Sequence, residues 1–399
     1  MTPRQWLPLI AIVICVFIVN MSEFMPIGLL TDIATDFDIS ESKAGLLISF
    51  YAWAVAILSL PIMLLLRKME YRRMFLMTIA LFAFFQILSG ISSSYGMLMA
   101  SRIGVAVAHS IFWSIATPLA VRVVPPELQK LALSAVATGT SVAMIAGLPL
   151  GRIIGLALGW RMTFIVIAVV SIVALVLLIF VFPRLDNPGT FTLRRLPGLL
   201  SNRVLIGIYV MLAIYVTGYY TGYSYIEPFL QQIAGFSETM TTVALTVFGA
   251  FGIVGSILFT KFYDRTRFRF MMMALLGAAV CLLLLRPSVI SMLLVLAVCA
   301  FWGLFATCFN VAFQNETLRA SPEDGTAISM SLFSGIFNVG IASGSLIGGW
   351  VTDSSAGVGS IGFVGAAFVI VAAAITAFYL IKKMRIADEE RAKRLAEIR

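Results

Sequence analysis

Residues 162–182 read MTFIVIAVVSIVALVLLIFVF, a run of 21 residues without a charged side chain. The hydrocarbon core of a bilayer is about 30 Å thick, and an α-helix of about 20 apolar residues crosses it. This run therefore predicts a membrane-spanning helix. A search for similar runs finds twelve, which predicts an all-α membrane protein with twelve transmembrane helices. The expected spans are 7–30, 43–66, 74–94, 97–123, 131–155, 162–182, 204–226, 239–261, 270–285, 288–313, 326–352 and 359–381.

The composition of the whole chain supports this interpretation. The chain has 399 residues, of which 60% are apolar and 12% are charged. Soluble domains are about 45–50% apolar and about 25% charged, so this chain lacks the charge that a water-facing surface needs. The lipid bilayer is therefore its expected surroundings, and a soluble globular fold is excluded.

Several function classes are excluded by missing patterns. The net charge is +9, but the basic residues fall in short clusters between the spans, so no nucleic-acid partner is expected. The four cysteines lie inside apolar runs without the spacing of a metal site or a disulfide framework, and neither a metal nor a cofactor is expected. There is no HExxH, nucleophile elbow or GxxxxGK[ST] loop, which argues against an enzyme or an ATP-driven pump.

The loops between the spans carry an asymmetric charge. Loops rich in Lys and Arg stay in the cytoplasm. With the N-terminus inside, nearly all basic residues outside the spans fall on the cytoplasmic side, and the opposite side receives only Lys43, Arg161 and Arg286. Both termini are therefore predicted to be cytoplasmic.

The polar segment 182–203 contains three Pro and four Arg and separates the twelve spans into six and six. The two halves share a sequence pattern. The pair Gly147 and Gly151 on the fifth span recurs as Gly344 and Gly348 on the eleventh. A GxxxG pair lets helices approach closely, and its repetition supports a duplicated six-helix unit with pseudo-two-fold symmetry, which favours a carrier over a channel. The expected domains are an N-terminal bundle (1–182), a cytoplasmic linker (183–203), a C-terminal bundle (204–384) and a cytoplasmic tail (385–399).

Six stretches distributed over both halves carry a more specific signal. They are NMSEFMPIGLLTDIA (20–34), FYAWAVAILSLP (50–61), SRIGVAVAHSIFWSI (101–115), residues 137–164, YSYIEPF (223–229) and SLFSGIFNVGIASG (331–344). In these stretches the chain resembles the major facilitator superfamily, in its drug/proton antiporter branch, and most closely the bacterial sugar efflux transporters. The resemblance implies an inner-membrane secondary transporter, sufficient as a monomer, that exports sugar-like small molecules in exchange for protons. Export of drugs or nucleosides on the same fold stays open as an alternative.

The family's gating motifs are only partly present. The basic end of the loop after the second span survives as Arg72 and Arg73, and its counterpart after the eighth span keeps Asp264 and Arg265. The antiporter pattern of the fifth span keeps Gly147, Pro149 and Gly151, but Arg152 stands where a last Gly is common. We expect Arg152 to extend its charged end to the membrane surface.

Charged groups inside the membrane are costly and usually functional. Glu23 and Arg102 lie at similar depth, about 10 Å and about 8 Å below the outer surface at 1.5 Å per residue, and His109 shares a helix face with Arg102. The functional interpretation makes Glu23 a proton carrier, with Arg102 favouring its ionised form and His109 either relaying the proton or titrating itself. The alternatives are a static Glu23–Arg102 pair, an Arg102 that satisfies backbone carbonyls, or a His109 that contacts the sugar.

Polar and aromatic groups near the middle of the spans suit a hydroxyl-rich ligand, because hydrogen bonds fix its orientation and rings cover its apolar side. Each tyrosine and tryptophan has the alternative of an interfacial anchor. The candidate substrate contacts are Asn20, Trp53, Trp113, Tyr215, Tyr219, Tyr220, Tyr223, Ser334 and Asn338.

Overall fold

The computed structural model of the protein describes residues 3–66, 69–185, 198–199, 201–322 and 326–397. The secondary structure of this described part is entirely helical, as predicted. Ten of its helices are long and apolar enough to cross a membrane. The fifth predicted span adds the apolar stretch Ala146–Leu158, and one helix covers both the eighth and the ninth span.

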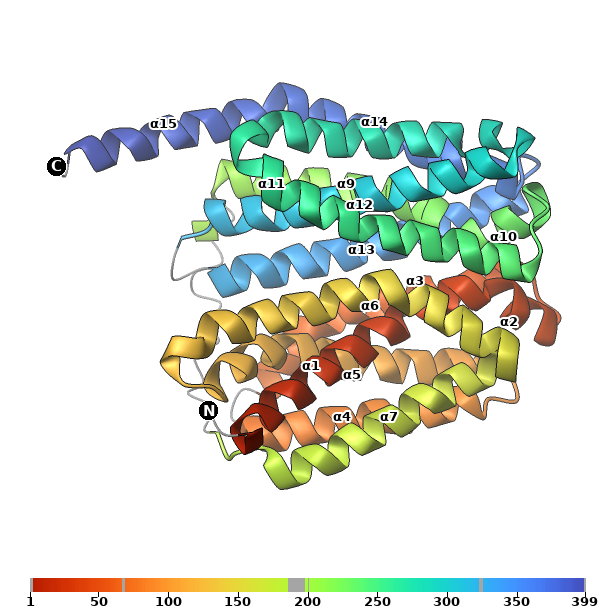
Figure 1. Ribbon diagram of the computed structural model, residues 1–399, viewed down its shortest axis with the longest axis horizontal. Helices are drawn as coiled ribbons and strands as arrows, with labels where there is room; N and C mark the ends of the chain where they lie inside the picture. Colours follow the sequence, from red (N-terminus) through yellow and green to blue (C-terminus); the bar gives the residue numbers. More distant parts are fainter. Residues whose placement is uncertain (1–2, 67–68, 186–197, 200, 323–325, 398–399) are drawn as a thin grey trace. The chain divides into compact units, whose positions relative to one another are not determined.

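The first six spans form the helices coloured red to yellow-green in Figure 1. The first span is not one continuous helix as expected, because a 3-10 turn at Met25–Leu29 interrupts it. Pro26 in this turn has no N–H to donate, which removes one helical hydrogen bond. The helices are α1 (Pro3–Phe24), α2 (Leu30–Asp36), α3 (Glu41–Leu66), α4 (Tyr71–Gly90), α5 (Tyr95–Arg122), α6 (Gln129–Leu158) and α7 (Trp160–Val181).

The remaining spans form the helices coloured green to blue in Figure 1. The expected spans 239–261 and 270–285 both lie within α11, on either side of a kink at Thr266, whose backbone angles are non-helical (φ −133°, ψ 28°). The helices are α9 (Arg203–Tyr223), α10 (Ile226–Pro228), the π-helix Phe229–Ile233, α11 (Glu238–Leu285), α12 (Met292–Ala320), α13 (Thr326–Asp353), α14 (Ile361–Ile375), the π-helix Thr376–Leu380 and α15 (Ile381–Glu397).

The chain divides into two compact units. Unit 1 consists of Met1–Phe191 together with Tyr225–Gly249, and unit 2 consists of Thr192–Ser224 together with Ala250–Arg399. The chain therefore passes from unit 2 into unit 1 immediately after Ser224. Most of the expected linker, 183–203, lies outside the described residues.

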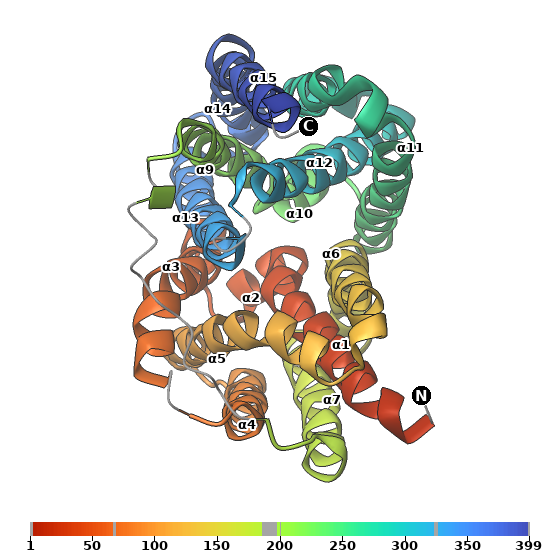
Figure 2. The same cartoon turned by 90° about the vertical axis from the view of Figure 1, so that its left-hand side faces the viewer.

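Close helix packing marks both units. In unit 1, α4 packs against α5 and α7, and α1 packs against α6; in unit 2, α9 packs against α13 and α14 (Figure 2). A Cβ atom on Gly151 of α6 would lie 2.6 Å from the Met25 Cβ, and one on Gly344 of α13 would lie 2.4 Å from the Thr217 carbonyl oxygen. Only glycine allows such approaches, which is how helices associate in lipid.

Candidate functional site

A buried polar cluster lies between α1, α3 and α5 of unit 1. The Arg102 side chain is 1% exposed and donates from Nη1 to Ser22 Oγ (3.0 Å) and from Nη2 to the Ser22 carbonyl (2.9 Å). Its guanidinium also lies 4.5 Å from the centre of the Tyr51 ring, a cation–π contact. Arg102 is thus held by a hydroxyl, a carbonyl and an aromatic face, all of them uncharged.

Glu23 belongs to the same cluster without being bonded to the arginine. It is partly exposed, and its charge interacts with that of Arg102. Among the described residues, however, no ion pair within 4.0 Å joins Glu23 to Arg102. A carboxyl group placed in this way can change its protonation state without breaking an Arg102 contact.

His109 connects to this cluster through a residue that the sequence analysis did not select. Tyr51 Oη and His109 Nδ1 lie 2.7 Å apart, and the two rings meet edge to face at 5.6 Å. Tyr51 therefore touches both Arg102 and His109. The second ring neighbour of His109 is Trp113, 6.5 Å away between ring centres.

The remaining unit 1 candidates are placed less specifically. Asn20 is buried and donates to the Val16 carbonyl of its own helix (2.7 Å), as a polar side chain inside a membrane helix often does. Trp53 and Trp113 are both half-buried. These three residues lie on α1, α3 and α5, the helices that carry the Arg102 cluster.

Unit 2 brings the four candidate tyrosines into one aromatic cluster. Tyr215 stacks on Phe309 with ring centres 3.4 Å apart, and Tyr219 stacks on Tyr215 at 6.1 Å. Tyr219 and Tyr223 both meet Trp302 of α12, at 5.7 Å and 6.0 Å. All of these rings are buried, together with Tyr220, which touches both Tyr219 and Tyr223. These contacts describe a packed aromatic wall instead of an interfacial belt.

Tyr215 Oη on α9 and Asn338 Oδ1 on α13 are two of the buried polar atoms of unit 2 that make no hydrogen bond within the described residues. The Asn338 Nδ2 donates to the Ser334 carbonyl (3.0 Å), while the Ser334 side chain is exposed. Buried polar atoms in proteins nearly always form a hydrogen bond. The Asn338 amide oxygen therefore requires a donor, and the Tyr215 hydroxyl requires a donor or an acceptor.

A second buried arginine of unit 1 forms a direct ion pair. Arg152 Nη1 lies 3.0 Å from Glu227 Oε1, and both side chains are 0% exposed. The expectation that Arg152 extends to the membrane surface is therefore wrong. Glu227 lies 75 positions along the chain, and its Pro-flanked place in YSYIEPF was the only sequence signal that could have singled it out.

The gating residues are distributed unevenly. Arg72 donates to the Ile179 carbonyl (2.7 Å), while the Arg73, Asp264 and Arg265 side chains are exposed. Pro149 is buried inside α6, between the close-packed Gly147 and Gly151.

Near Asp264 and Arg265 in the chain, a different arginine, Arg267, forms ion pairs. Arg267 pairs with the buried Glu316 of α12 and, at 2.5 Å, with Asp388 of α15. Tyr263 also donates to Glu316. An acidic residue at the end of α12 and one on the tail helix thus meet at the break in α11.

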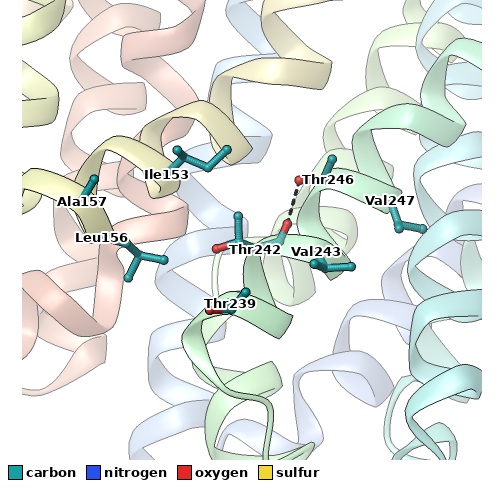
Figure 3. Close-up of a pocket in the computed structure, with 8 residues that line it drawn as sticks. All are labelled: Ile153, Leu156, Ala157, Thr239, Thr242, Val243, Thr246 and Val247. Atoms are coloured by element: carbon teal, nitrogen blue, oxygen red, sulfur yellow. Dashed lines mark hydrogen bonds between the residues drawn. The ribbon is translucent and has the colours of Figure 1, made fainter.

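Unit 1 also has an apolar groove of about 480 Å³ between α6 and α11 (Figure 3). The hydroxyls of Thr242 and Thr246 bond to carbonyls of their own helix, at 3.0 Å and 2.8 Å, which leaves the wall apolar. None of the candidate substrate contacts lines it. The lining residues are Ile153, Leu156, Ala157, Thr239, Thr242, Val243, Thr246 and Val247.

Metal-binding side chains do not gather in the described part of the chain. A search of these residues finds no group of three or more His, Cys, Asp or Glu side chains that could hold a metal ion. The four cysteines are all buried and free.

Comparison with known proteins places these features in context. The profile of the Major Facilitator Superfamily matches residues 12–345. Two solved structures with this fold are those of a bacterial homologue of the human lysosomal transporter Spinster, both inward-facing. The unoccupied form has a TM-score of 0.76 at 14% identity, and the occupied form has a TM-score of 0.76 at 16% identity. In both cases the match covers 96% of this chain and 98% of that chain.

Proposed function

Because this chain belongs to the Major Facilitator Superfamily, and is thus a secondary transporter and not an enzyme, we propose that it exports sugars or sugar-like molecules in exchange for protons. The two halves of the chain, 1–182 and 204–384, would expose the substrate alternately to the two sides of the membrane. The basic residues of the loops support a topology with both termini in the cytoplasm. The membrane would be the inner membrane of a bacterium.

The observation that carries the proposal is the pair of unpartnered polar atoms in the aromatic part of unit 2. Tyr215 Oη and Asn338 Oδ1 are buried on two helices that pack together, and each lacks a hydrogen-bond partner in the described residues. A sugar hydroxyl can donate to the amide oxygen and accept from or donate to the phenol. The stacked rings of Tyr215 and Tyr219 offer flat apolar faces to the C–H side of a sugar ring.

The proton step is assigned to the Arg102 cluster of unit 1. Glu23 is near Arg102 without bonding to it, so the carboxylate benefits from the positive charge while remaining free to accept a proton. His109 is linked to Arg102 through Tyr51 and would orient or relay that proton. A change in the distance between Glu23 and Arg102 during transport would release the proton.

A lipophilic drug or a nucleoside is the alternative cargo. The apolar groove between α6 and α11 and the number of buried rings in unit 2 favour it, since a flat apolar molecule needs few hydrogen bonds. The two cargo classes differ in their dependence on the Tyr215 hydroxyl and the Asn338 amide.

The test is transport by the purified protein in liposomes that enclose a pH dye. Addition of arabinose or a galactoside is expected to drive proton movement in the wild type, and Asn338→Ala is expected to weaken it. Tyr209→Phe is the matched control, because the Tyr209 hydroxyl also lies on α9 but already donates to the Ser329 carbonyl (2.9 Å). Sugar flux without proton movement would identify a facilitator, and no response to any sugar would favour drug or nucleoside export.

A further inference from the structure

We propose that the kink of α11 at Thr266 and the first turns of α15 together form a binding site for the headgroup of an anionic phospholipid. The site lies in unit 2, apart from the substrate and proton groups, so it depends neither on the cargo nor on proton coupling. Three features support it: a contact between the two helices, a surplus of positive charge, and exposed aromatic side chains. The basic residues of the site are Arg265, Arg269, Lys382, Lys383 and Arg385.

Phe268 of α11 lies between the two helices. The Arg267 guanidinium lies 4.9 Å from the centre of the Phe268 ring, and the Arg385 guanidinium of α15 lies 5.3 Å from the same centre. Arg267 also forms an ion pair with Asp388 of α15, so α15 contacts this part of α11 through two side chains. The basic segments of the two helices are therefore neighbours in space, although Arg267 and Asp388 are 121 positions apart.

Both segments lie where a membrane-spanning stretch ends. The kink at Thr266 falls between the predicted spans 239–261 and 270–285, and Lys382 directly follows the predicted span 359–381. The helix α15 continues from α14 through the π-helix (Figure 1), so its first turns leave the membrane together with that span. Clusters of Lys and Arg next to a span attract anionic lipid headgroups. The position of these residues therefore matches the headgroup layer.

The positive charge of these segments is only partly neutralised. Arg267 is neutralised, because it pairs with Glu316 and Asp388. The five basic residues of the site form no ion pair within 4.0 Å in the described part of the chain, although three exposed acidic residues are close to them in sequence. Those acidic residues are Asp264, Glu389 and Glu390. The exposed cations are Arg265, Arg269, Lys382 and Arg385. Their N–H groups are available to the oxygens of a phosphate group.

Exposed aromatic side chains precede the cations on both segments. Phe378 is 84% exposed and Tyr379 is 41% exposed, and both belong to the predicted span that ends just before Lys382. The Lys383 ammonium lies 5.9 Å from the centre of the Tyr379 ring. On α11, Phe262 is 41% exposed. An apolar surface followed by positive charge matches the acyl chains and the phosphate of a phospholipid, in that order.

A lipid fits this surface better than a soluble anion does. The exposed rings are unfavourable in water, whereas acyl chains cover them. Lys382 and Arg385 are three residues apart and therefore lie on one face of α15. A phospholipid can thus place its chains against the rings and its charged phosphate beside these two cations.

Binding of phosphatidylglycerol to the purified full-length protein, in micelles of a neutral detergent, tests the site. Fluorescently labelled phosphatidylglycerol is titrated against the protein, and phosphatidylethanolamine with the same label and acyl chains is the comparison. We expect phosphatidylglycerol to bind at least about tenfold more tightly, because each Lys or Arg near the membrane surface strengthens the attraction of an anionic lipid several-fold. The difference should shrink as the salt concentration rises, since exposed charges are screened.

The variant Arg269→Gln with Arg385→Gln removes one cation from each helix. Its affinity for phosphatidylglycerol should fall at least about tenfold. The matched control is Lys43→Gln with Arg286→Gln, which removes the same net charge from exposed residues that are predicted to lie on the opposite side of the membrane. The control should stay within about twofold of the wild type, because charges separated by the bilayer are screened from the site.

Equal affinity of the wild type for the two lipids overturns the proposal, and this comparison does not depend on how well any variant folds. An unchanged affinity in Arg269→Gln with Arg385→Gln also overturns it, as does an equal loss in the control. If the double variant does not fold, Lys382→Gln changes one exposed side chain and should weaken binding by about threefold or more. None of these outcomes depends on what the protein transports.

Discussion

Two buried arginines of unit 1 have their positive charge stabilised by different kinds of neighbours. Arg102 lies against a hydroxyl, a carbonyl and the face of Tyr51, with Glu23 near but not bonded to it. Arg152 binds Glu227 directly, and both side chains are fully buried. A cation held by neutral groups leaves its neighbouring carboxyl group free to exchange a proton at little structural cost. Where a carboxylate holds the cation, protonation of that carboxylate breaks the ion pair and therefore affects the stability of the fold.

The largest expected effect compares the two glutamates by the same substitution. Glu227→Gln should lower the free energy of unfolding by about 3–5 kcal/mol, because it leaves Arg152 buried without its ion-pair partner. Glu23→Gln should change it by less than about 1 kcal/mol, since no Arg102 contact is lost. Unfolding of the reconstituted protein measures both. Equal losses in the free energy of unfolding for the two variants would contradict the claim that the two arginines are stabilised differently.

The next effect tests the link between Arg102 and His109. Tyr51→Phe keeps the ring beneath Arg102 but removes the hydroxyl that lies 2.7 Å from His109 Nδ1. We expect a loss of about 1–3 kcal/mol, the cost of an unpaired buried polar atom, together with a slower proton-coupled flux. Trp113→Phe is a control that leaves the hydroxyl in place. Equal unfolding free energies for wild type and Tyr51→Phe would show that the contact has no energetic role.

A smaller effect separates a bound hydroxyl from an unbound one in unit 2. Tyr215→Phe should raise the KM for sugar by a factor that corresponds to about 0.5–1.5 kcal/mol, the net value of one hydrogen bond, with little change in unfolding. Tyr209→Phe should leave the KM for sugar unchanged but lower the free energy of unfolding, because the Tyr209 hydroxyl already donates to the Ser329 carbonyl. Sugar-dependent flux and thermal unfolding of both variants provide the readouts. An unchanged KM in Tyr215→Phe would remove this residue from the binding site.

The smallest effect concerns Arg267, which has one buried acidic partner and one that is partly exposed to water. Asp388→Asn on the tail helix removes one of the two carboxylates bound to Arg267, but Asp388 is 38% exposed. Its loss should cost only about 0.2–1 kcal/mol. Glu316→Gln, which removes the buried partner of the same arginine, should cost several times more. A larger effect of Asp388→Asn than of Glu316→Gln would contradict the rule that burial decides the value of these pairs.

Much of the fold follows from the sequence, because hydropathy alone decides which runs enter a bilayer. One exception has a local cause. Pro26 breaks the first span, and a single proline does not change the average hydropathy of a run enough to be seen.

The site was less accessible to sequence reasoning. Helical spacing correctly grouped Arg102 with His109 on one face of α5, since such spacing is local. Tyr51 lies 58 positions from His109, and Glu227 lies 75 positions from Arg152, so only the folded chain could join them. The motif residues Asp264 and Arg265 have exposed side chains, whereas Arg267, two positions beyond Arg265, pairs with both Glu316 and Asp388.

The most direct test of the account follows protons and sugar in the same liposomes for the wild type and Glu23→Gln. We expect arabinose or a galactoside to move protons across the wild-type membrane. Glu23→Gln should exchange labelled sugar down its gradient but move no protons. Proton movement that persists in Glu23→Gln, or a wild type that carries sugar without protons, would contradict the account.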